Sequence, residues 1–246
     1  THPAPYRLAI ADFNNDGIDD IFVSSMGLQY RDPDSNNDFI LPYPDLLLLS
    51  DSSGRFIDAS LNIDDQNNGN GKICGFSHDA STGDFDNDGD YDIFACNLLL
   101  VNDGLGNFEI HQDLDFNLQQ AYGNPMSSLI VDLNNDNYAD LVFWNFDNRP
   151  NSIPEEGFAL VSDGTANVDN WTLVELPEGP FGRNHNKFNH AAWGDLNNDG
   201  NNDVVVGITR DLPYYEGAYV QVLMGDGAGN LAVSYTHLRA HETVVH

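Results

Sequence analysis

The stretch Asp84-Phe-Asp-Asn-Asp-Gly-Asp-Tyr-Asp92 decides how the chain is interpreted. It places carboxylates at its first, third, fifth and ninth positions and a glycine at its sixth. Ca²⁺ takes about six to eight oxygen ligands, so a short loop with this spacing can surround one ion. Gly89 permits the sharp turn because it has no Cβ to exclude positive φ angles. The stretch therefore predicts a calcium-binding loop.

The same spacing returns three more times, in stretches that begin at Asp12, Asp132 and Asp195. In the stretch at Asp132, Asn137 stands at the sixth position, where the other copies have glycine. Asn tolerates the left-handed backbone region better than most residues, so the turn is retained at some cost. A single copy would be a weak signal in a chain rich in Asp and Asn, whereas four copies flanked by apolar residues are a strong one.

We predict about four bound Ca²⁺, each held by side-chain oxygens at positions one, three, five and nine and by the backbone carbonyl at position seven. The predicted side-chain ligands are Asp12, Asn14, Asp16, Asp20, Asp84, Asp86, Asp88, Asp92, Asp132, Asn134, Asp136, Asp140, Asp195, Asn197, Asp199 and Asp203. The residues predicted to contribute the carbonyl are Ile18, Asp90, Tyr138 and Asn201. No catalytic residue and no organic cofactor site is predicted.

The EF-hand loop is the competing interpretation, because it begins in the same way. Such a loop closes with an acid at position twelve and lies between helices. Position twelve is apolar in all four copies, namely Val23, Ala95, Phe143 and Val206. The residues after each loop are β-branched or aromatic, which is typical of strands. We therefore expect the four loops at the turns of β-hairpins and reject the EF-hand.

A second hairpin signal follows each loop. It lies within the apolar segments Leu46 to Phe56, Leu98 to Phe108, Ala159 to Gly164 and Val220 to Leu231, most of which contain Asp-Gly. The repeating unit thus has two hairpins and four strands, and the loops start at residues 12, 84, 132 and 195. Repeats of this size with four strands predict propeller blades, which stack because one blade cannot bury both faces alone.

The predicted fold is accordingly all-β, a β-propeller of four-stranded blades. About four blades are expected, at about 1–62, 76–118, 121–178 and 188–233. We interpret them as part of a larger ring, for example a seven-bladed one.

The repeated loop resembles the FG-GAP/VCBS repeat, the calcium-binding blade of integrin α-subunit propellers and of many secreted bacterial proteins. The resemblance rests on Asp12-Phe-Asn-Asn-Asp-Gly17, Asp84-Phe-Asp-Asn-Asp-Gly89 and Asp195-Leu-Asn-Asn-Asp-Gly200, and it extends from Tyr6 to Val233. Asn137 departs from the pattern, which puts the affinity of that site in doubt. The resemblance implies the fold and bound calcium more firmly than any activity, because one fold hosts many functions.

The charge of the chain restricts its partners. With 39 acids and 9 bases the formal net charge is −30, which disfavours nucleic acid and anionic membrane surfaces. No segment approaches the roughly 20 apolar residues of a membrane-spanning helix. The two cysteines, Cys74 and Cys96, could pair, but their spacing does not require it.

The two ends of the chain receive separate interpretations. The chain begins at Thr1 without Met, which we interpret as a fragment or a processed end. Residues Ser234 to His246 carry three of the eight His, and their composition breaks from that of the blades. We interpret 234–246 as a non-native tail, similar to a translated adapter read. His237 and His241 have the spacing of a helical metal pair, but a zinc site there is not favoured.

These observations favour an extracellular, cell-surface or periplasmic calcium-binding propeller that acts as a binding or adhesion module. Millimolar external calcium fills even weak loops, and the metal is expected to be structural. Its protein or carbohydrate ligand is expected on the long insertions, which are Gly27 to Pro44, Asp64 to Gly75, Asn145 to Gly157, Glu178 to Phe188 and Thr209 to Gly217. The alternatives are a propeller-type polysaccharide lyase or hydrolase, or its accessory domain, and a structural spacer of a large surface protein.

Overall fold

The computed structural model describes residues 5–25, 28–31, 38–41, 45–64, 77–96, 98–111, 125–145, 157–165, 167, 170–182, 185–210 and 216–239. Contacts divide the chain into two compact units, Thr1–Gln120 and Ala121–His246. Apart from the short 3-10 helix Ser60–Asn62, the elements of the described residues are β-strands.

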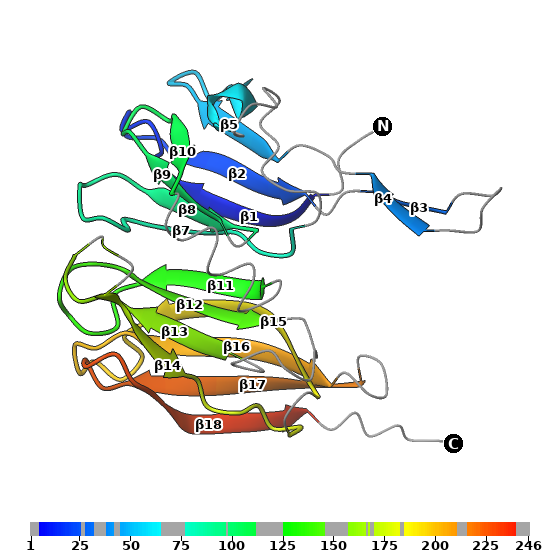
Figure 1. Ribbon diagram of the computed structural model, residues 1–246, viewed down its shortest axis with the longest axis vertical. Helices are drawn as coiled ribbons and strands as arrows, with labels where there is room; N and C mark the ends of the chain where they lie inside the picture. Colours follow the sequence, from blue (N-terminus) through cyan, green and yellow to red (C-terminus); the bar gives the residue numbers. More distant parts are fainter. Residues whose placement is uncertain are drawn as a thin grey trace. The chain divides into compact units, whose positions relative to one another are not determined.

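The first unit holds two antiparallel four-stranded sheets (Figure 1). Blade 1 has the strand order β1-β2-β5-β6, with β1 Pro5–Ala11, β2 Asp20–Ser25, β5 Leu46–Ser50 and β6 Phe56–Asp58. Blade 2 has the order β10-β9-β8-β7, with β7 Ser81–Gly83, β8 Asp92–Ala95, β9 Leu98–Asn102 and β10 Phe108–Ile110. A separate hairpin, β3 Leu28–Arg31 and β4 Asp38–Leu41, is inserted between β2 and β5.

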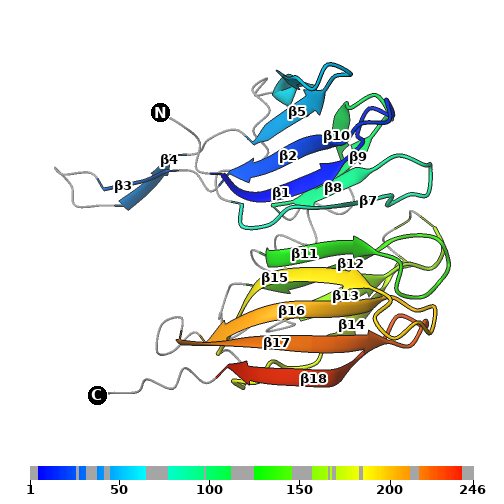
Figure 2. The ribbon, with the colours of Figure 1, turned by 180° about the vertical axis from the view of Figure 1, so that it is seen from behind.

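The second unit repeats this arrangement (Figure 2). Blade 3 has the order β11-β12-β13-β14, with β11 Pro125–Val131, β12 Asp140–Asn145, β13 Gly157–Val161 and β14 Thr172–Glu175. Blade 4 has the order β15-β16-β17-β18, with β15 Asn186–Gly194, β16 Asp203–Arg210, β17 Glu216–Gly225 and β18 Leu231–Arg239. The predicted all-β propeller fold of four-stranded blades is confirmed, whereas the larger ring stays a prediction.

Each blade has two faces, because successive side chains of a strand point to opposite sides of the sheet. In the first unit, Ala11, Phe22 and Leu47 of blade 1 pack against Ile93 and Leu100 of blade 2. We call the face of a blade that packs on the next blade its downstream face, and the opposite face its upstream face.

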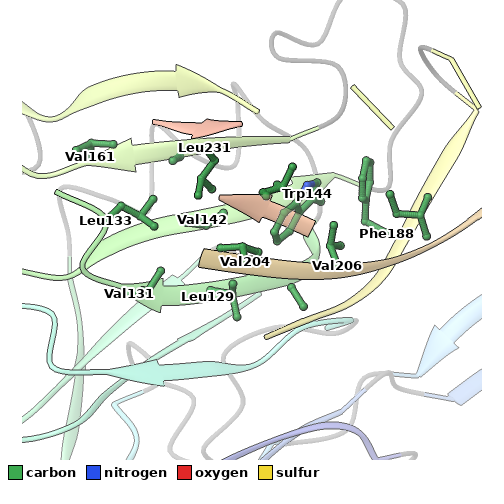
Figure 3. Packing of buried hydrophobic residues seen from close by; sticks show 14 residues of the cluster. Leu129, Val131, Leu133, Val142, Trp144, Val161, Phe188, Val204, Val206 and Leu231 are labelled. Atoms are coloured by element: carbon green, nitrogen blue, oxygen red, sulfur yellow. The ribbon is translucent and has the colours of Figure 1, made fainter. Parts of the chain in front are cut away.

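The second unit packs in the same way. Val131 and Val142 of blade 3 pack against Val204 and Val206 of blade 4, and Figure 3 shows these side chains meeting. Phe22 occupies the position in blade 1 that Val142 occupies in blade 3. Ile93 occupies the position in blade 2 that Val204 occupies in blade 4. A downstream face therefore lies on an upstream face in both units.

Blade 2 is complete although only two residues separate β8 from β9. The turn is possible because Cys96 takes a left-handed conformation with a φ of 59°. Cys96 is disulfide-bonded. Cys74, the other cysteine of the chain, lies outside the described residues.

The last strand of blade 4 continues beyond the expected end of the propeller at Val233. β18 runs to Arg239, and Tyr235 to Arg239 pair with Ala218 to Val222 of β17. The register shifts between Val222 and Leu223, opposite the point where the composition changes. The composition changes at Ser234, but the strand does not end there, because β17 pairs with the Thr- and Tyr-containing residues that follow. The non-native origin of the tail stays a prediction.

Candidate metal centre

The four predicted calcium loops connect the first and second strands of the four blades. They are the Asp12 loop (12–20), the Asp84 loop (84–92), the Asp132 loop (132–140) and the Asp195 loop (195–203). In an antiparallel four-stranded sheet this turn lies at the same end as the turn between the third and fourth strands, as Figures 1 and 2 show. The predicted hairpin position of the loops is therefore confirmed.

The first Asp of each loop holds the turn together. Asp84 Oδ1 accepts a hydrogen bond from the backbone N–H of Asp88 at 3.1 Å, and Oδ2 accepts one from Gly89 at 3.1 Å. The Asp12 and Asp195 loops repeat both bonds. These bonds fold the loop around the first carboxylate, and each carboxylate oxygen keeps a further lone pair for a cation.

The Asp132 loop forms the same turn with a different residue at position six. Asp132 Oδ2 accepts a hydrogen bond from the backbone N–H of Asn137 at 3.0 Å, and Oδ1 accepts one from Asn135 at 2.7 Å. Asn137 has a φ of 71°, so it adopts the left-handed conformation expected of it. Sequence reasoning overlooked a second left-handed position, the fourth. It is occupied by Asn15, Asn87, Asn135 and Asn198, with φ angles of 56°, 59°, 60° and 60°.

The fifth and seventh positions are also linked in every loop. The Oδ1 atom of the fifth residue accepts a hydrogen bond from the backbone N–H of the seventh. The four donor and acceptor pairs are Ile18 and Asp16 at 3.0 Å, Asp90 and Asp88 at 3.2 Å, Tyr138 and Asp136 at 2.8 Å, and Asn201 and Asp199 at 2.9 Å. The residues predicted to contribute a carbonyl ligand therefore lie beside the fifth carboxylate.

The Asp84 loop brings the most carboxylates together. One oxygen from each of Asp84, Asp86 and Asp88 lies within 4.8 Å of the others. Asp86 Oδ1 and Asp90 Oδ1 are buried and have no hydrogen-bond partner among the described residues. Buried carboxylate oxygens need a partner, and a hard cation is one that suits several of them at once. This donor set fits Ca²⁺.

The carboxylates of the Asp84 loop disturb each other's ionisation. Burial, followed by the charge of Asp88, raises the pKa of Asp86. Burial, followed by a side-chain hydrogen bond with Asp88, raises the pKa of Asp90 to about 7. Without a cation, these groups hold protons at a pH where ordinary aspartates have lost them.

The Asp132 loop satisfies its acids internally to a larger extent. Asp136 Oδ2 accepts hydrogen bonds from the Asn134 side-chain amide at 2.9 Å and from the Ser162 hydroxyl at 2.9 Å. In the Asp195 loop, the Asn197 amide donates to Asp199 Oδ2 at 2.8 Å. At the third loop position, Asn134 and Asn197 therefore supply a hydrogen-bond donor, whereas the Asp84 loop has the carboxylate of Asp86 there.

The Asp at position nine, predicted as a metal ligand, accepts hydrogen bonds from the backbone in every loop. Asp20, Asp92, Asp140 and Asp203 are fully buried at the start of the second strand. Asp92 Oδ2 accepts a hydrogen bond from the backbone N–H of Phe85 at 2.7 Å, and Oδ1 accepts one from Asn102 at 2.9 Å. The other three repeat this pattern. The ninth carboxylate thus ties the loop to the end of the third strand, and its additional role as a metal ligand stays a prediction.

Contacts between blades occur at the loops within each unit. The Asn102 side chain of blade 2 donates to the backbone carbonyl of Phe13 in the Asp12 loop at 2.8 Å. In the second unit, the Asn202 side chain donates to the carbonyl of Asp132 at 2.7 Å. Asn135 donates to Asn201 Oδ1 at 2.9 Å. Asn102, Asn135 and Asn202 could not be singled out from the sequence, because the chain contains many Asn residues.

The predicted ligand-binding insertions are only partly described. Of the insertion from Gly27 to Pro44, the hairpin β3–β4 is described, and the segment from Glu178 to Phe188 lacks only residues 183 and 184. Most of the insertions beginning at Asp64, Asn145 and Thr209 lies outside the described residues.

Comparisons with known proteins give a limited result. No family model and no curated protein matches the chain. Among solved structures, the V. cholerae biofilm matrix protein Bap1 matches with a TM-score of 0.43 and 13% sequence identity, over 96% of this chain and 40% of that one. The chain therefore spans less than half the length of that protein. Among the described residues, no helix has the length and apolar character needed to cross a membrane.

Proposed function

We propose that the chain is a calcium-binding β-propeller in which four Ca²⁺ ions are structural. The observation that carries the proposal is a pair of hydrogen bonds common to the four loops, from the sixth N–H to the first Asp and from the seventh N–H to the fifth Asp, together with three carboxylates of the Asp84 loop within 4.8 Å. One frame recurring four times at equivalent turns indicates one common ligand.

The electrostatics support a structural role for the metal. Like charges about 4 Å apart repel by about 4 kcal/mol at an effective dielectric constant near 20. A bound dication removes this repulsion and gives the buried oxygens of Asp86 and Asp90 a partner. Ligand binding stabilises the folded state by about 2.7 kcal/mol per site at a hundredfold excess over Kd. Four sites can therefore supply much of the stability of an ordinary domain.

We further propose that the blades belong to the FG-GAP/VCBS class of repeats and form part of a larger propeller or multidomain surface protein. The Asp-x-Asx-x-Asp-Gly loop at the first turn of a four-stranded blade supports this assignment. The proposed calcium dependence favours a location where external calcium is high, at the cell surface, outside the cell or in the periplasm.

The function we propose for this scaffold is binding or adhesion, with a protein or glycan ligand held by the insertions between strands. Loops on a rigid scaffold are the usual location of binding residues. A net charge of −30 disfavours nucleic acid as the ligand.

The experiment is a glycan-array and turnover screen of the purified chain, with and without EDTA. Calcium-dependent retention of a ligand that is not turned over supports a binding module. Depolymerisation of a polysaccharide would contradict it and favour the lyase or hydrolase alternative. Absence of both binding and turnover would favour a structural spacer.

A further inference from the structure

The hairpin that carries the Asp84 loop has shorter strands than the corresponding hairpins of the other blades. β7 has three residues and β8 has four, whereas the first strands of blades 1, 3 and 4 have seven, seven and nine. Backbone pairing between β7 and β8 ends at Ser81 and Phe94. Few backbone hydrogen bonds therefore hold together the two strands behind this loop.

The base of the hairpin is closed by other means. Cys96 directly follows β8 and is disulfide-bonded. Because Cys74 is the other cysteine of the chain, the bond closes a ring from residue 74 to residue 96 that includes the whole Asp84 loop. The backbone N–H of Cys96 also donates a hydrogen bond to Oδ1 of Asp79, which precedes β7, at 3.1 Å.

The same two positions are backbone partners in the other three blades. The pairs equivalent to Asp79 and Cys96 are Arg7 and Ser24, Ser127 and Trp144, and His190 and Gly207. In blade 2, a side-chain hydrogen bond and a covalent bond thus occupy the place where the other blades continue their strand pairing.

A short strand connects the disulfide to the loop. Cys96 has a φ of 59°, a left-handed conformation that a residue other than glycine keeps only where its surroundings impose it. Asp92, the ninth residue of the loop, stands at the other end of the four-residue strand β8. Its carboxylate accepts the hydrogen bond from Phe85 that ties the loop. A change in the backbone at Cys96 therefore acts on the loop through one short strand.

The Asp84 loop also needs a restraint more than the other loops do. It brings one oxygen from each of Asp84, Asp86 and Asp88 within 4.8 Å of the others. Like charges at this separation repel, so the empty loop tends to open. The short pairing of β7 with β8 opposes this opening only weakly.

We propose that the disulfide is a clamp on the Asp84 site, so that the oxidised chain binds calcium there more tightly than the reduced chain. A cross-link restricts the open conformations of the segment that it encloses. The oxidised loop therefore loses less conformational freedom when it closes around an ion. The inference rests on the proposed calcium binding, and it adds redox regulation of one site.

The coupling also acts in the opposite direction. If oxidation strengthens calcium binding by a given factor, bound calcium disfavours reduction by the same factor at equilibrium. Reduction by dithiothreitol is a thiol–disulfide exchange. One thiolate of dithiothreitol attacks a cysteine sulfur to form a mixed disulfide, and the other cysteine leaves as a thiolate and takes up a proton. The second thiol of dithiothreitol then displaces the first cysteine as a thiol, and dithiothreitol is oxidised to its cyclic disulfide.

The first experiment compares calcium affinity, measured by competition with a calcium-sensitive dye, in the oxidised chain and in a double variant, Cys74→Ser with Cys96→Ser. We expect one site to weaken by about fivefold or more, the lower end of typical coupling between sites, and the others to be unchanged. Asp84→Ala is the matched control. Introduced into both proteins it removes the clamped site, so the remaining affinities should be equal. Circular dichroism spectra in calcium establish that each variant is folded.

The second experiment uses the unmodified chain, so it does not depend on the folding of the double variant. The chain is equilibrated with mixtures of reduced and oxidised dithiothreitol, in calcium or in EDTA, and its free thiols are quantified by alkylation. The ratio of reduced to oxidised dithiothreitol at which half of the chains are reduced should be higher in calcium, by about the factor found for affinity. Asp84→Ala should lose this shift. Asp12→Ala, which alters the equivalent loop of blade 1, should keep it.

Two results would overturn the inference and leave the calcium proposal intact. One is an equal calcium affinity in the oxidised chain and the folded double variant, or an equal reduction midpoint in calcium and in EDTA. The other is loss of the shift in Asp12→Ala to the same extent as in Asp84→Ala, because the protection would then come from the stability of the whole unit. An oxidised chain that binds no calcium would contradict the proposed function itself, and the clamp with it.

Discussion

The side chain of Asn102 joins two neighbouring blades by donating a 2.8 Å hydrogen bond to the backbone carbonyl of Phe13. It also donates to the carbonyl of Tyr91 in its own blade at 3.0 Å. Phe13 is the second residue of the Asp12 loop, and Tyr91 is the eighth residue of the Asp84 loop. One amide therefore connects two predicted metal loops across the interface between blades 1 and 2.

Replacing Asn102 by Ala should lower the free energy of unfolding by about 1–3 kcal/mol, because two carbonyls at a buried position lose their donor. Urea unfolding in excess calcium measures the change. The control is Asn170→Ala, since Asn170 is exposed and lies on neither blade of this interface. A loss below about 0.5 kcal/mol, the usual range of surface substitutions, would show that the amide does not hold the blades together.

Gly104 and Gly17 provide a matched pair of turn glycines. Both have positive φ angles, 74° and 86°, so Ala at either position adds about 1–2 kcal/mol of backbone strain. A Cβ at Gly104 would lie 2.4 Å from Asp90 Oδ2, whereas one at Gly17 would meet nothing within 4 Å. We expect Gly104→Ala to lower the melting temperature more than Gly17→Ala. Equal effects would mean that the buried Asp90 side chain can move aside freely.

The four sites should differ in affinity. The Asp84 loop has three carboxylates in one cluster, whereas Asp136 of the Asp132 loop already accepts two side-chain hydrogen bonds. More ligand charge generally gives tighter calcium binding. Asp84→Ala should therefore reduce the total calcium affinity more than Asp132→Ala, as measured by competition with a calcium-sensitive dye. A larger loss with Asp132→Ala would reverse this ranking.

The pH dependence of stability should change sign when calcium is removed. In the metal-free loops, burial raises the pKa of Asp92 to about 8 and that of Asp140 to about 7, from an ordinary value of 3.8. The folded state then holds protons that the unfolded chain has released. The resulting stability is complete below pH 3.8 and is lost as the pH rises through 7 to 8.

In EDTA we therefore expect a lower urea midpoint at about pH 8 than at about pH 5. With calcium bound, the carboxylates are held in their charged form, so acidification should release the metal and destabilise the protein. Matched urea titrations in EDTA and in calcium test the expected pH dependence of the metal-free and the calcium-bound protein. An EDTA midpoint that rises with pH would contradict the expected ionisation of Asp92 and Asp140.

The fold could be predicted from the sequence because its signals are local and repeated. The loop Asp84 to Asp92 and the Asp-Gly turns each specify a hairpin from adjacent residues. The left-handed conformation of Asn137 could also be predicted, since it depends on the backbone of one residue. Four repeats of the same pattern then predicted the blades.

Roles that depend on distant residues could not be predicted. The ninth carboxylate, such as Asp92, bonds Asn102 at the end of the third strand, and this pairing follows from sheet register rather than from spacing in the loop. The contact between Asn102 and Phe13 joins residues 89 positions apart. The end of β18 at Arg239 likewise depends on pairing with β17 and not on composition.

Calorimetric titration of the chelated protein with calcium tests the central claim most directly. The account predicts a stoichiometry of about four Ca²⁺ per chain, one for each nine-residue loop. The tightest site should be the Asp84 loop, so the Asp84→Ala variant should lack that site. Magnesium should compete weakly because it requires near-octahedral geometry at shorter distances. A stoichiometry of one or zero, or a preference for Zn²⁺ over Ca²⁺, would contradict the assignment of four structural calcium sites.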